Sequence, residues 1–422
     1  MKKVCVMGLG YIGLPTAAIF ASRGLRVHGV DINKDAVEKI NQGETHIFEP
    51  SLDQLVHAVV QSGYLVADTL PTEADVFILA VPTPFVDHHK PDISYIESAV
   101  LSISSYLRKG NLIILESTSP VGTTEKIAGW LRELRADLFE GEVPQIYIAH
   151  CPERVLPGNI LAELVENDRV IGGINEVSTQ QACEFYKRIV SGEILLTHAR
   201  TAELAKLVEN SFRDVNIAFA NELSLICDKL DIDVWELIKL ANRHPRVNIL
   251  QPGPGVGGHC IAVDPWFIVD AASSEAKLIR TAREVNDSKP VFIINKIKER
   301  ASKLHEPKIA LFGLSFKADV DDLRESPALE IVESLAKELN AELLVVEPYI
   351  DALPSRLSHY EHISLVEMDT ALEKAELLVM LVNHKQFYDI DYEIIAEKMV
   401  IDTKGIWSTL KKHSSDAMLV SI

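Results

Sequence analysis

A group of glycines directly behind the first apolar stretch constrains this chain more than any other feature. Residues 3–8 are short and apolar, which predicts a buried strand, and they lead into Gly8, Gly10 and Gly13 in a G-x-G-x-x-G arrangement. A helical pattern occupies residues 13–23. Alone, the glycine pattern is weak. Between a strand and a helix it predicts a dinucleotide-binding βαβ unit, because the glycines permit a tight turn, close approach of a pyrophosphate and close helix packing.

An acidic residue closes the next apolar run and completes this context. Asp31 ends residues 26–31 and lies 18 positions after Gly13. A carboxylate there accepts hydrogen bonds from ribose hydroxyls and repels a 2′-phosphate, so we predict NAD rather than NADP. The helix N-terminus offers N–H donors to the pyrophosphate, and Tyr11 and Ile12 are further candidate cofactor contacts. The competing interpretation is a glycine turn that binds nothing.

Further along, short apolar runs alternate with helical patterns. We predict strands at 75–81, 111–116 and 145–149, which are continuous apolar runs typical of parallel strands covered on both faces. The carboxyl ends of such strands are where open α/β sheets bind ligands. Three positions that follow these ends are candidate cofactor contacts: Pro82, Thr83 and Thr118.

The pattern changes in the middle of the chain. Residues 201–230 contain no proline or glycine and carry helix-spaced apolar side chains, which predicts a helix more than twice the mean length. A loop rich in proline and glycine, 252–258, interrupts the helical region, which resumes over 276–304. Apolar runs typical of strands then return at 308–313, 343–347, 377–381 and 400–402.

These patterns predict an α/β protein with two Rossmann-like doubly wound domains joined by a central helical domain with one long helix. The expected domains are an NAD-binding domain over 1–197, a helical domain over 198–304 and a second Rossmann-like domain over 305–422.

Charge and cysteine usage exclude several function classes. Lys and Arg number 42 against 61 Asp and Glu, a formal net charge of −19, so no basic excess is present to displace counterions from nucleic acid. Five widely spaced cysteines without a CxxC pair disfavour zinc sites and disulfide frameworks, and we expect no metal. Such cysteine usage suits a reducing cytoplasm, and neither a signal peptide nor a membrane-spanning run is expected.

One cysteine stands apart from the others. Cys260 follows the loop rich in proline and glycine and precedes Asp264 by four residues, which makes it a candidate nucleophile. The alternative is a small buried residue, the usual role of an isolated cysteine. That role is expected for the remaining four: Cys5, Cys151, Cys183 and Cys227.

Polar residues on the long helix and after a strand end add candidates. Lys206 and Asn210 are four positions apart and share one helix face, for which the alternative is a solvated polar face. Glu153 and Arg154 follow a predicted strand end. Three more residues could present donors to phosphate or sugar oxygens, or could be ordinary surface residues: Arg213, His244 and Arg246.

Together, the motifs resemble the nucleotide-sugar dehydrogenases that oxidise UDP-glucose, GDP-mannose and related compounds at C6. The resemblance extends over almost the whole chain, through GLGYIGLP at 8–15, VPTP at 81–84, ESTSPVGTT at 116–124, CPERVLPG at 151–158, ELAKLVENSFRDVNIAFANEL at 203–223, GVGGHCIAVDP at 255–265 and FGLSFKADVDDLRESPA at 312–328. It implies an NAD-dependent four-electron oxidation of a primary alcohol to a carboxylate, with two NAD reduced per sugar.

The resemblance also implies roles for individual residues. Cys260 would trap the aldehyde as a thiohemiacetal, whose oxidation gives a thioester that water hydrolyses. Lys206 would act as acid/base and stabilise alkoxide charge, with Asn210 as its companion. Three further positions match family residues close to the thioester or to its attacking water: Glu153, Asp264 and Thr118.

Substrate contacts follow in the same way. Family analogy places Phe316 and Lys317 on the UDP-sugar, the backbone of Gly257 on the sugar and Arg324 on NAD. Val320 stands where the family usually has Thr, so one hydrogen bond is absent or replaced. The remaining implied substrate contacts are Arg154, Val155, Lys206, Asn210, Arg213, His244 and Arg246. The family is dimeric through its central helical region, so we expect a homodimer, with cofactor and substrate meeting in a cleft between the two Rossmann-like halves.

Within the family, PERVLPG at 152–158 and NRHPRVNIL at 242–250 resemble the branch that oxidises UDP-N-acetyl-D-mannosamine (UDP-ManNAc) for surface polysaccharide, as in enterobacterial common antigen synthesis. UDP-glucose dehydrogenases generally carry PEFLxEG in place of the first stretch, which speaks against UDP-glucose. Two alternatives remain open. One is a 6-dehydrogenase for another UDP-hexose or UDP-HexNAc such as UDP-GlcNAc. The other is a non-catalytic nucleotide-sugar-binding regulator, which would be expected to have lost Cys260, Lys206 or Asp264.

Overall fold

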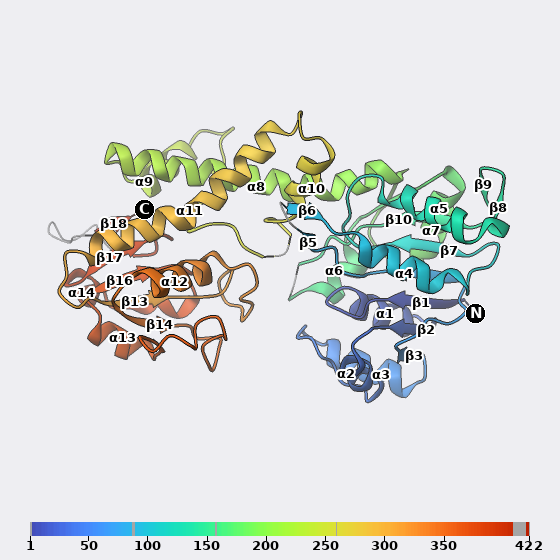
Figure 1. Ribbon diagram of the computed structural model, residues 1–422, viewed down its shortest axis with the longest axis horizontal. Helices are drawn as coiled ribbons and strands as arrows, with labels where there is room; N and C mark the ends of the chain where they lie inside the picture. Colours follow the sequence, from blue (N-terminus) through green and yellow to red (C-terminus); the bar gives the residue numbers. More distant parts are fainter. Residues whose placement is uncertain (1, 87–88, 157, 259, 408–418, 422) are drawn as a thin grey trace. The chain divides into compact units, whose positions relative to one another are not determined.

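The structure is a computed structural model that describes residues 2–86, 89–156, 158–258, 260–407 and 419–421. It forms two compact units, which Figure 1 shows as ribbons: unit 1 is Met1–Glu209 with Trp266–Ser273, and unit 2 is Asn210–Pro265 with Ser274–Ile422. Each unit contains one large β-sheet. The expected division into three domains, with boundaries near 198 and 305, stays a prediction.

The sheet of unit 1 has eight strands in the order β12-β11-β10-β7-β4-β1-β2-β3. The strands are β1 (Lys3–Met7), β2 (Arg26–Val30), β3 (Leu65–Asp68), β4 (Val76–Leu79), β7 (Leu112–Leu115), β10 (Tyr147–His150), β11 (Arg169–Gly173) and β12 (Ile194–His198). Neighbours run parallel except β10 and β11, which are antiparallel. The strand order reverses at β1, which makes the sheet doubly wound and creates a ligand-binding switch point at the carboxyl end of β1.

Helices cover both faces of this sheet. They are α1 (Gly13–Ser22), α2 (Lys34–Asn41), α3 (Leu52–Gln61), α4 (Ser94–Ser104), α5 (Thr123–Leu134), α6 (Ile160–Glu166) and α7 (Glu176–Tyr186). Three short elements lie on the connections: the hairpins β5 (Phe85–Val86) with β6 (Lys90–Pro91) and β8 (Phe139–Glu140) with β9 (Val143–Pro144), and the single turn η2 (Ala136–Leu138).

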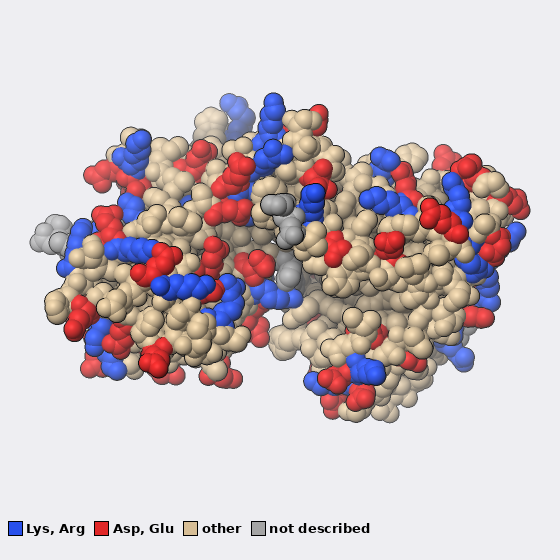
Figure 2. Space-filling model, viewed as in Figure 1, with Lys and Arg blue, Asp and Glu red and all other residues tan. Residues whose placement is uncertain are grey.

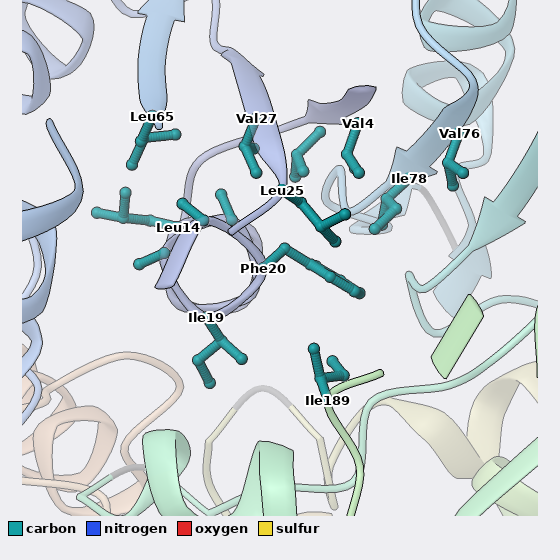
Figure 3. Packing of buried hydrophobic residues seen from close by; sticks show 14 of the residues in the cluster. Val4, Leu14, Ile19, Phe20, Leu25, Val27, Leu65, Val76, Ile78 and Ile189 are labelled. Atoms are coloured by element: carbon teal, nitrogen blue, oxygen red, sulfur yellow. The ribbon is translucent and has the colours of Figure 1, made fainter. Parts of the chain in front are cut away.

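Alternation of apolar strand residues explains why both faces are covered. Val4 and Ile78 belong to a core shared with α1, α3, α6 and α7, whereas their neighbours Cys5 and Phe77 belong to a second core with α4 and α5. Figure 3 shows the first core with α1 seen end-on. Side chains from the strands line one side of the helix and Ile189 lies on the other. Both cores together fix the carboxyl edge of the sheet, from which the loops of the site extend.

The sheet of unit 2 has six parallel strands in the order β15-β14-β13-β16-β17-β18. The strands are β13 (Lys308–Phe312), β14 (Glu342–Val346), β15 (Ile363–Leu365), β16 (Leu377–Met380), β17 (Met399–Asp402) and β18 (Leu419–Ser421). One face packs with α11 (Lys277–Ala301) and α12 (Pro327–Glu338), and the other with α13 (Met368–Lys374), η3 (Lys385–Asp389) and α14 (Tyr392–Ala396).

The helical part of the chain, which follows the first sheet in the sequence, contains α8 (Ala199–Leu230), α9 (Val234–Ala241), α10 (Asp264–Ala271) and the start of α11. In unit 2, buried amides join α8 to α11: Asn221 Nδ2 donates to Asn286 Oδ1 at 2.8 Å, and Asn286 Nδ2 donates to Asp214 Oδ1 at 2.8 Å. Asn221 Oδ1 also accepts from Gly253 N–H at 2.9 Å. The helix pair therefore holds the start of the loop that precedes Cys260.

The predicted fold class is confirmed: the chain contains two Rossmann-like sheets and, between them in the sequence, a helical region with one long helix. Three strands of the unit 1 sheet were not predicted from the sequence: β3, β11 and β12. β3 and β12 carry exposed residues, and β11 runs antiparallel to β10. Acidic and basic side chains are mixed over the face shown in Figure 2. In the part of the chain that the structure describes, no helix has the length and apolar character needed to span a membrane.

Candidate functional site

The glycines behind β1 form an open cradle. Gly8 has φ +91°, a conformation that L-residues rarely adopt. A Cβ at Gly13 would lie 1.8 Å from the Gly8 carbonyl oxygen, so α1 approaches the turn this closely only without a side chain. A Cβ at Gly10 would meet no atom within 4 Å, and no side chain caps α1 at Ile12. This open position beside uncapped helix N–H groups fits the pyrophosphate of NAD.

Asp31 is held at the edge of this cradle. Its Oδ2 accepts from Leu9 N–H at 2.8 Å and its Oδ1 accepts from Asn33 N–H at 2.9 Å. The carboxylate is only partly buried. Its position at the end of β2 therefore fits hydrogen bonding to a ribose of NAD. Tyr11, within the turn, has an exposed side chain.

The loops after β4 and β7 are tied together at the same edge of the sheet. The Thr83 hydroxyl donates to Thr118 O at 2.7 Å, and the Ser117 hydroxyl donates to Val81 O at 2.7 Å. β4 and β7 are neighbours, so the ends of both strands meet. The candidate cofactor contacts Pro82, Thr83 and Thr118 are thus brought together.

Lys206 and Glu153 occupy a buried part of unit 1. Lys206 is 8% exposed, so the alternative of a solvated polar face is wrong. Burial raises the pKa of Glu153 to about 7, and the positive charge of Lys206 opposes that rise. Burial and the same charge lower the pKa of His150 to about 3, which keeps this imidazole neutral. A carboxyl with a pKa near neutrality beside a buried ammonium is suited to proton transfer.

Glu203, one turn before Lys206, fixes α8 to the start of α5. Its carboxylate accepts from Gly122 N–H at 2.6 Å, from Thr124 N–H at 2.7 Å and from the Thr124 hydroxyl at 2.6 Å. Burial raises the pKa of Glu203 despite these donors. Sequence reasoning missed this anchor because its partners are 79 and 81 positions away.

Arg154 makes contacts that the sequence did not indicate. Its guanidinium donates a hydrogen bond to the Glu209 carboxylate on α8 at 3.0 Å and forms an ion pair with it at 2.6 Å, and it donates to Asp168 O at 3.3 Å. The neighbouring Val155 N–H donates to the Glu153 carboxylate. Substrate contacts for Arg154 and Val155 stay predictions.

The cysteines differ in exposure as expected. Cys260 is exposed, whereas the other four are buried. Burial raises the pKa of Cys5 to about 11 and that of Cys151 to about 12, so these thiols are protonated at neutral pH. The thiol of Cys260 is therefore the accessible candidate nucleophile. His259, beside it in the sequence motif, lies outside the described residues.

Asn210 and Asp264 form a pair next to Cys260 in unit 2. Asn210 Nδ2 donates to Asp264 Oδ2 at 2.5 Å, and Asp264 is 2% exposed. The Asp264 N–H donates to Cys260 O at 2.9 Å. Three candidate catalytic residues thus share one cluster at the start of α10.

The loop rich in proline and glycine packs on the segment that follows β13. A Cβ at Gly257 would lie 2.3 Å from Glu325 O, and one at Gly258 would lie 3.0 Å from the Phe316 ring. The glycines therefore allow the backbone before Cys260 to contact the segment that carries Phe316. Lys317 in that segment is exposed.

Several cationic candidates lie at the surface. Arg324 forms a bidentate pair with Asp322, with Nε–Oδ1 at 2.9 Å and Nη2–Oδ2 at 2.7 Å. Val320, in the place of the usual Thr, is partly buried. The remaining candidates are exposed: Arg213, His244 and Arg246. Ligand contacts for these four cationic residues stay predictions.

Comparison with known proteins identifies the family of the chain. Three models of the UDP-glucose/GDP-mannose dehydrogenase family match: the NAD binding domain over residues 2–190, the central domain over 200–288 and the UDP binding domain over 310–409. The chain is 63% identical to a UDP-N-acetyl-D-mannosamine dehydrogenase from Campylobacter jejuni, over 92% of this chain and 97% of the relative. It is 57% identical to an NDP-N-acetyl-D-galactosaminuronic acid dehydrogenase from Ralstonia nicotianae, over 96% of each. Among solved structures, UDP-D-ManNAc dehydrogenase from Pyrococcus horikoshii superposes with a TM-score of 0.87 at 39% identity, covering 100% of this chain and 99% of that one.

Proposed function

The chain belongs to the UDP-glucose/GDP-mannose dehydrogenase family, and we propose that it oxidises UDP-N-acetyl-D-mannosamine at C6 to the uronate. Each turnover converts a primary alcohol and water to a carboxylate and reduces two NAD. As a family member the chain is an NAD-dependent nucleotide-sugar dehydrogenase. The sugar itself is the proposed part, and the uronate product suits surface polysaccharide synthesis.

The observation that carries the choice of sugar is the 63% identity to the Campylobacter jejuni enzyme over nearly the full length. The relative from Ralstonia nicotianae, named for N-acetyl-D-galactosaminuronic acid, is 57% identical and supports a second candidate sugar, the NDP-linked galactosamine epimer. Both sugars carry a 2-acetamido group and differ in ring stereochemistry. Overall identity separates them by only a few percentage points, so activity must decide.

In unit 1, we propose that Lys206 and Glu153 handle protons. NAD, when bound in the glycine cradle, accepts a hydride from the substrate carbon in each oxidation. The ammonium of Lys206 stabilises negative charge on the substrate oxygen. Glu153, with a pKa of about 7, can take a proton from water during thioester hydrolysis near neutral pH. Thr118 lies on the loop tied to Thr83 and orients the water.

In unit 2, we propose that Cys260 is the nucleophile. Its thiolate adds to the aldehyde carbon, and the resulting thiohemiacetal provides the carbon–hydrogen bond that is broken in the second oxidation. The thioester left on sulfur is then hydrolysed and the thiolate returns. Asn210 and Asp264, 2.5 Å apart, hold the start of α10 beside Cys260 and can orient the substrate oxygen.

Substrate binding is proposed for the segment behind β13, with Phe316 and Lys317 on the UDP-sugar and the Gly257 backbone on the sugar. The match of the UDP binding domain model over 310–409 supports this position. The other proposed substrate contacts are Arg154, Val155, Arg213, His244 and Arg246, and Arg324 is proposed to contact NAD.

We also propose a homodimer formed through α8. Six large apolar side chains of this helix are exposed at positions that recur every four or seven residues: Leu204, Val208, Phe212, Phe219, Ile226 and Leu230. Such a stripe is suited to a second copy of the same helix. Phe219→Asp should convert the dimer to monomer, which sedimentation velocity measures; an unchanged sedimentation coefficient would remove α8 from the interface.

The absence of disulfides among the five cysteines supports a reducing, cytoplasmic location.

NADH release at 340 nm tests the proposed reaction. Purified protein is given NAD and, separately, UDP-ManNAc, UDP-GalNAc, UDP-GlcNAc and UDP-glucose. Two NADH per UDP-ManNAc, with kcat/KM at least tenfold above the other sugars, is the expected result. Preference for UDP-GalNAc would select the second candidate, and one NADH per sugar would reject the four-electron scheme.

A further inference from the structure

The strand β16 ends near a buried imidazole that bonds two separate segments. His384 is fully buried, with Nε2 3.0 Å from Glu347 Oε2 at the end of β14. On the other side of the ring, Nδ1 is 2.9 Å from the backbone N of Asp319. Asp319 lies three residues after Phe316 in the segment proposed to bind the UDP-sugar. His384 therefore connects the sheet edge to that segment.

These contacts fix the tautomer of the ring. A backbone N–H can only donate, so Nδ1 must be the acceptor for Asp319. Nε2 then carries the hydrogen and donates to the Glu347 carboxylate. The Ser315 hydroxyl, which donates to Lys317 O at 2.7 Å, lies 3.4 Å from the same Nε2. Burial alone would raise the pKa of Glu347, but the hydrogen bonds from His384 and the Leu314 N–H lower it, so the carboxyl is ionised.

The segment that His384 bonds contains a residue in an unfavourable backbone conformation. Asp319 has φ +61°, a left-handed conformation that is uncommon outside glycine. Its carboxylate accepts from Lys385 N–H at 3.0 Å and from the Tyr349 hydroxyl at 2.9 Å. Asp319 is thus held through its N–H by His384 and through its side chain by Lys385 and Tyr349. Loss of the Nδ1 acceptor would release the N–H of a residue already in a costly conformation.

We infer that His384 is a positioning residue for nucleotide-sugar binding, which acts through Asp319 to place Phe316 and Lys317. The inference rests on the proposed function only in assigning the UDP-sugar to that segment. The ring is fully buried and therefore offers no surface to the substrate. His384 contributes an acceptor at Nδ1. Its hydrogen bond to Glu347 keeps the ring in the tautomer that leaves Nδ1 without a hydrogen.

Two substitutions separate the two ends of the ring. Asparagine places its amide near the position of Nδ1 and can still accept from Asp319, whereas glutamine places its amide near Nε2 and keeps only the Glu347 contact. Binding of UDP alone, measured by isothermal titration calorimetry, reports on the segment without depending on the sugar. His384→Gln should weaken UDP binding about tenfold, the effect of one lost hydrogen bond, and His384→Asn should stay within about threefold of wild type.

Two readouts show whether the effect is specific to positioning. The KM for NAD should change less than the affinity for UDP, because the glycine cradle lies in unit 1. The melting temperature should fall more in His384→Gln than in His384→Asn, because only the glutamine variant leaves the Asp319 N–H without its acceptor. The exposed His359→Gln is the matched control and should leave UDP binding unchanged. Equal UDP affinities for the asparagine and glutamine variants, or the reverse order, would overturn the inference.

A third substitution keeps the test decisive if His384→Gln does not fold. Tyr349→Phe removes the hydroxyl bond to Asp319 from a partly exposed site and should weaken UDP binding about threefold. Unchanged UDP affinity in Tyr349→Phe, together with unfolded His384→Gln, would reject the inference. If His384→Gln weakens UDP binding as expected but the wild-type protein does not oxidise UDP-ManNAc, the proposed sugar is rejected and His384 remains a positioning residue.

Discussion

The turns that follow the first strand of each sheet share one geometry and differ in what they leave open. The matched positions are Gly8 and Gly313, Leu9 and Leu314, and Asp31 and Glu347. The two glycines have φ +91° and +92°. Both leucine N–H groups donate to the carboxylate at the end of the second strand, at 2.8 and 2.7 Å. The turns after β1 and β13 therefore have the same backbone geometry and the same hydrogen bond.

The carboxylates are used differently. Asp31 is partly exposed at the edge of its turn, whereas Glu347 is 4% exposed and bonded to His384. Gly10 faces open space, whereas Ser315, at the matching position, uses its hydroxyl to bind Lys317 O. The first turn therefore leaves the Asp31 carboxylate and the space at Gly10 available to a ligand. In the second turn, His384 bonds the carboxylate and the Ser315 side chain occupies the space.

The helix starts differ in the same direction. α1 has no side-chain cap, whereas Ser326 caps α12 by accepting from Leu329 N–H at 3.3 Å and donates to Leu314 O at 2.6 Å. The residues between Ser315 and Ser326 form the segment that carries Phe316 and Lys317. A doubly wound sheet thus becomes a dinucleotide site when its first turn is open. Where that turn is filled, as in unit 2, we propose that the residues between Ser315 and Ser326 contact the nucleotide instead.

The largest expected effect separates the chemistry of unit 2 from the cofactor site of unit 1. Cys260→Ala should reduce formation of the uronate by at least about 10³-fold, because no other exposed thiol is present among the five cysteines. NAD affinity, measured by fluorescence titration, should stay unchanged. The buried Cys227→Ala is the control and should retain activity. Wild-type turnover in Cys260→Ala would refute the nucleophile.

The next effect tests whether the open space at Gly10 is the cofactor site. Gly10→Val places its Cβ where no protein atom lies within 4 Å and should raise the KM for NAD about a hundredfold with little change in melting temperature. Gly13→Ala should instead lower the melting temperature, because its Cβ would overlap the Gly8 carbonyl oxygen. Ser315→Ala, at the matched position of unit 2, should leave the KM for NAD unchanged. An unaltered KM in Gly10→Val would place NAD elsewhere.

A pH profile sharpens the contrast between two buried carboxyls. Burial raises the pKa of Glu153 to about 7, whereas hydrogen bonds lower that of Glu347. Glu153 is protonated below its pKa and cannot accept a proton there. The rate of thioester hydrolysis should fall about tenfold for each pH unit below 7. Stopped-flow kinetics at pH 5.5–8.5 measure this limb. Its persistence in Glu153→Gln would assign it to another group.

Sequence patterns predicted the sheets and the cofactor turn because their signals are local. Each strand run is a short continuous stretch, and the first strand, the glycines and Asp31 lie within about thirty residues of one another. Local patterns singled out Cys260 with Asp264 and Lys206 with Asn210, and the resemblance to a family supplied their roles. Spacing alone could not decide whether Lys206 was solvated, because burial depends on the residues that pack around α8.

The missed residues share one property, which is that their partners are distant in the sequence. Glu203 bonds residues about eighty positions away, and His384 bonds Glu347 and Asp319 from 37 and 65 positions away. No periodicity marks a carboxylate or an imidazole that supports another segment. The expected substrate role of Arg154 likewise could not reveal Glu209, which faces it only once α8 and the loop after β10 have folded.

The smallest effect tests the comparison at its centre, the two matched carboxylates. Asp31→Asn keeps an oxygen for Leu9 N–H but loses the negative charge, so the KM for NAD should rise about fivefold. The same change should raise the kcat/KM with NADP, because repulsion of the 2′-phosphate is removed. Glu347→Gln should leave both cofactor constants unchanged and weaken UDP binding instead, since its amide would present a donor or a weaker acceptor to His384 and Leu314. If Glu347→Gln altered NAD and Asp31→Asn altered UDP, the two turns would not have divided their ligands as their geometry indicates. If each substitution affects only its own nucleotide, the matched carboxylates have different roles. Asp31 is left to bind a ligand, whereas Glu347 is held by hydrogen bonds from the protein itself.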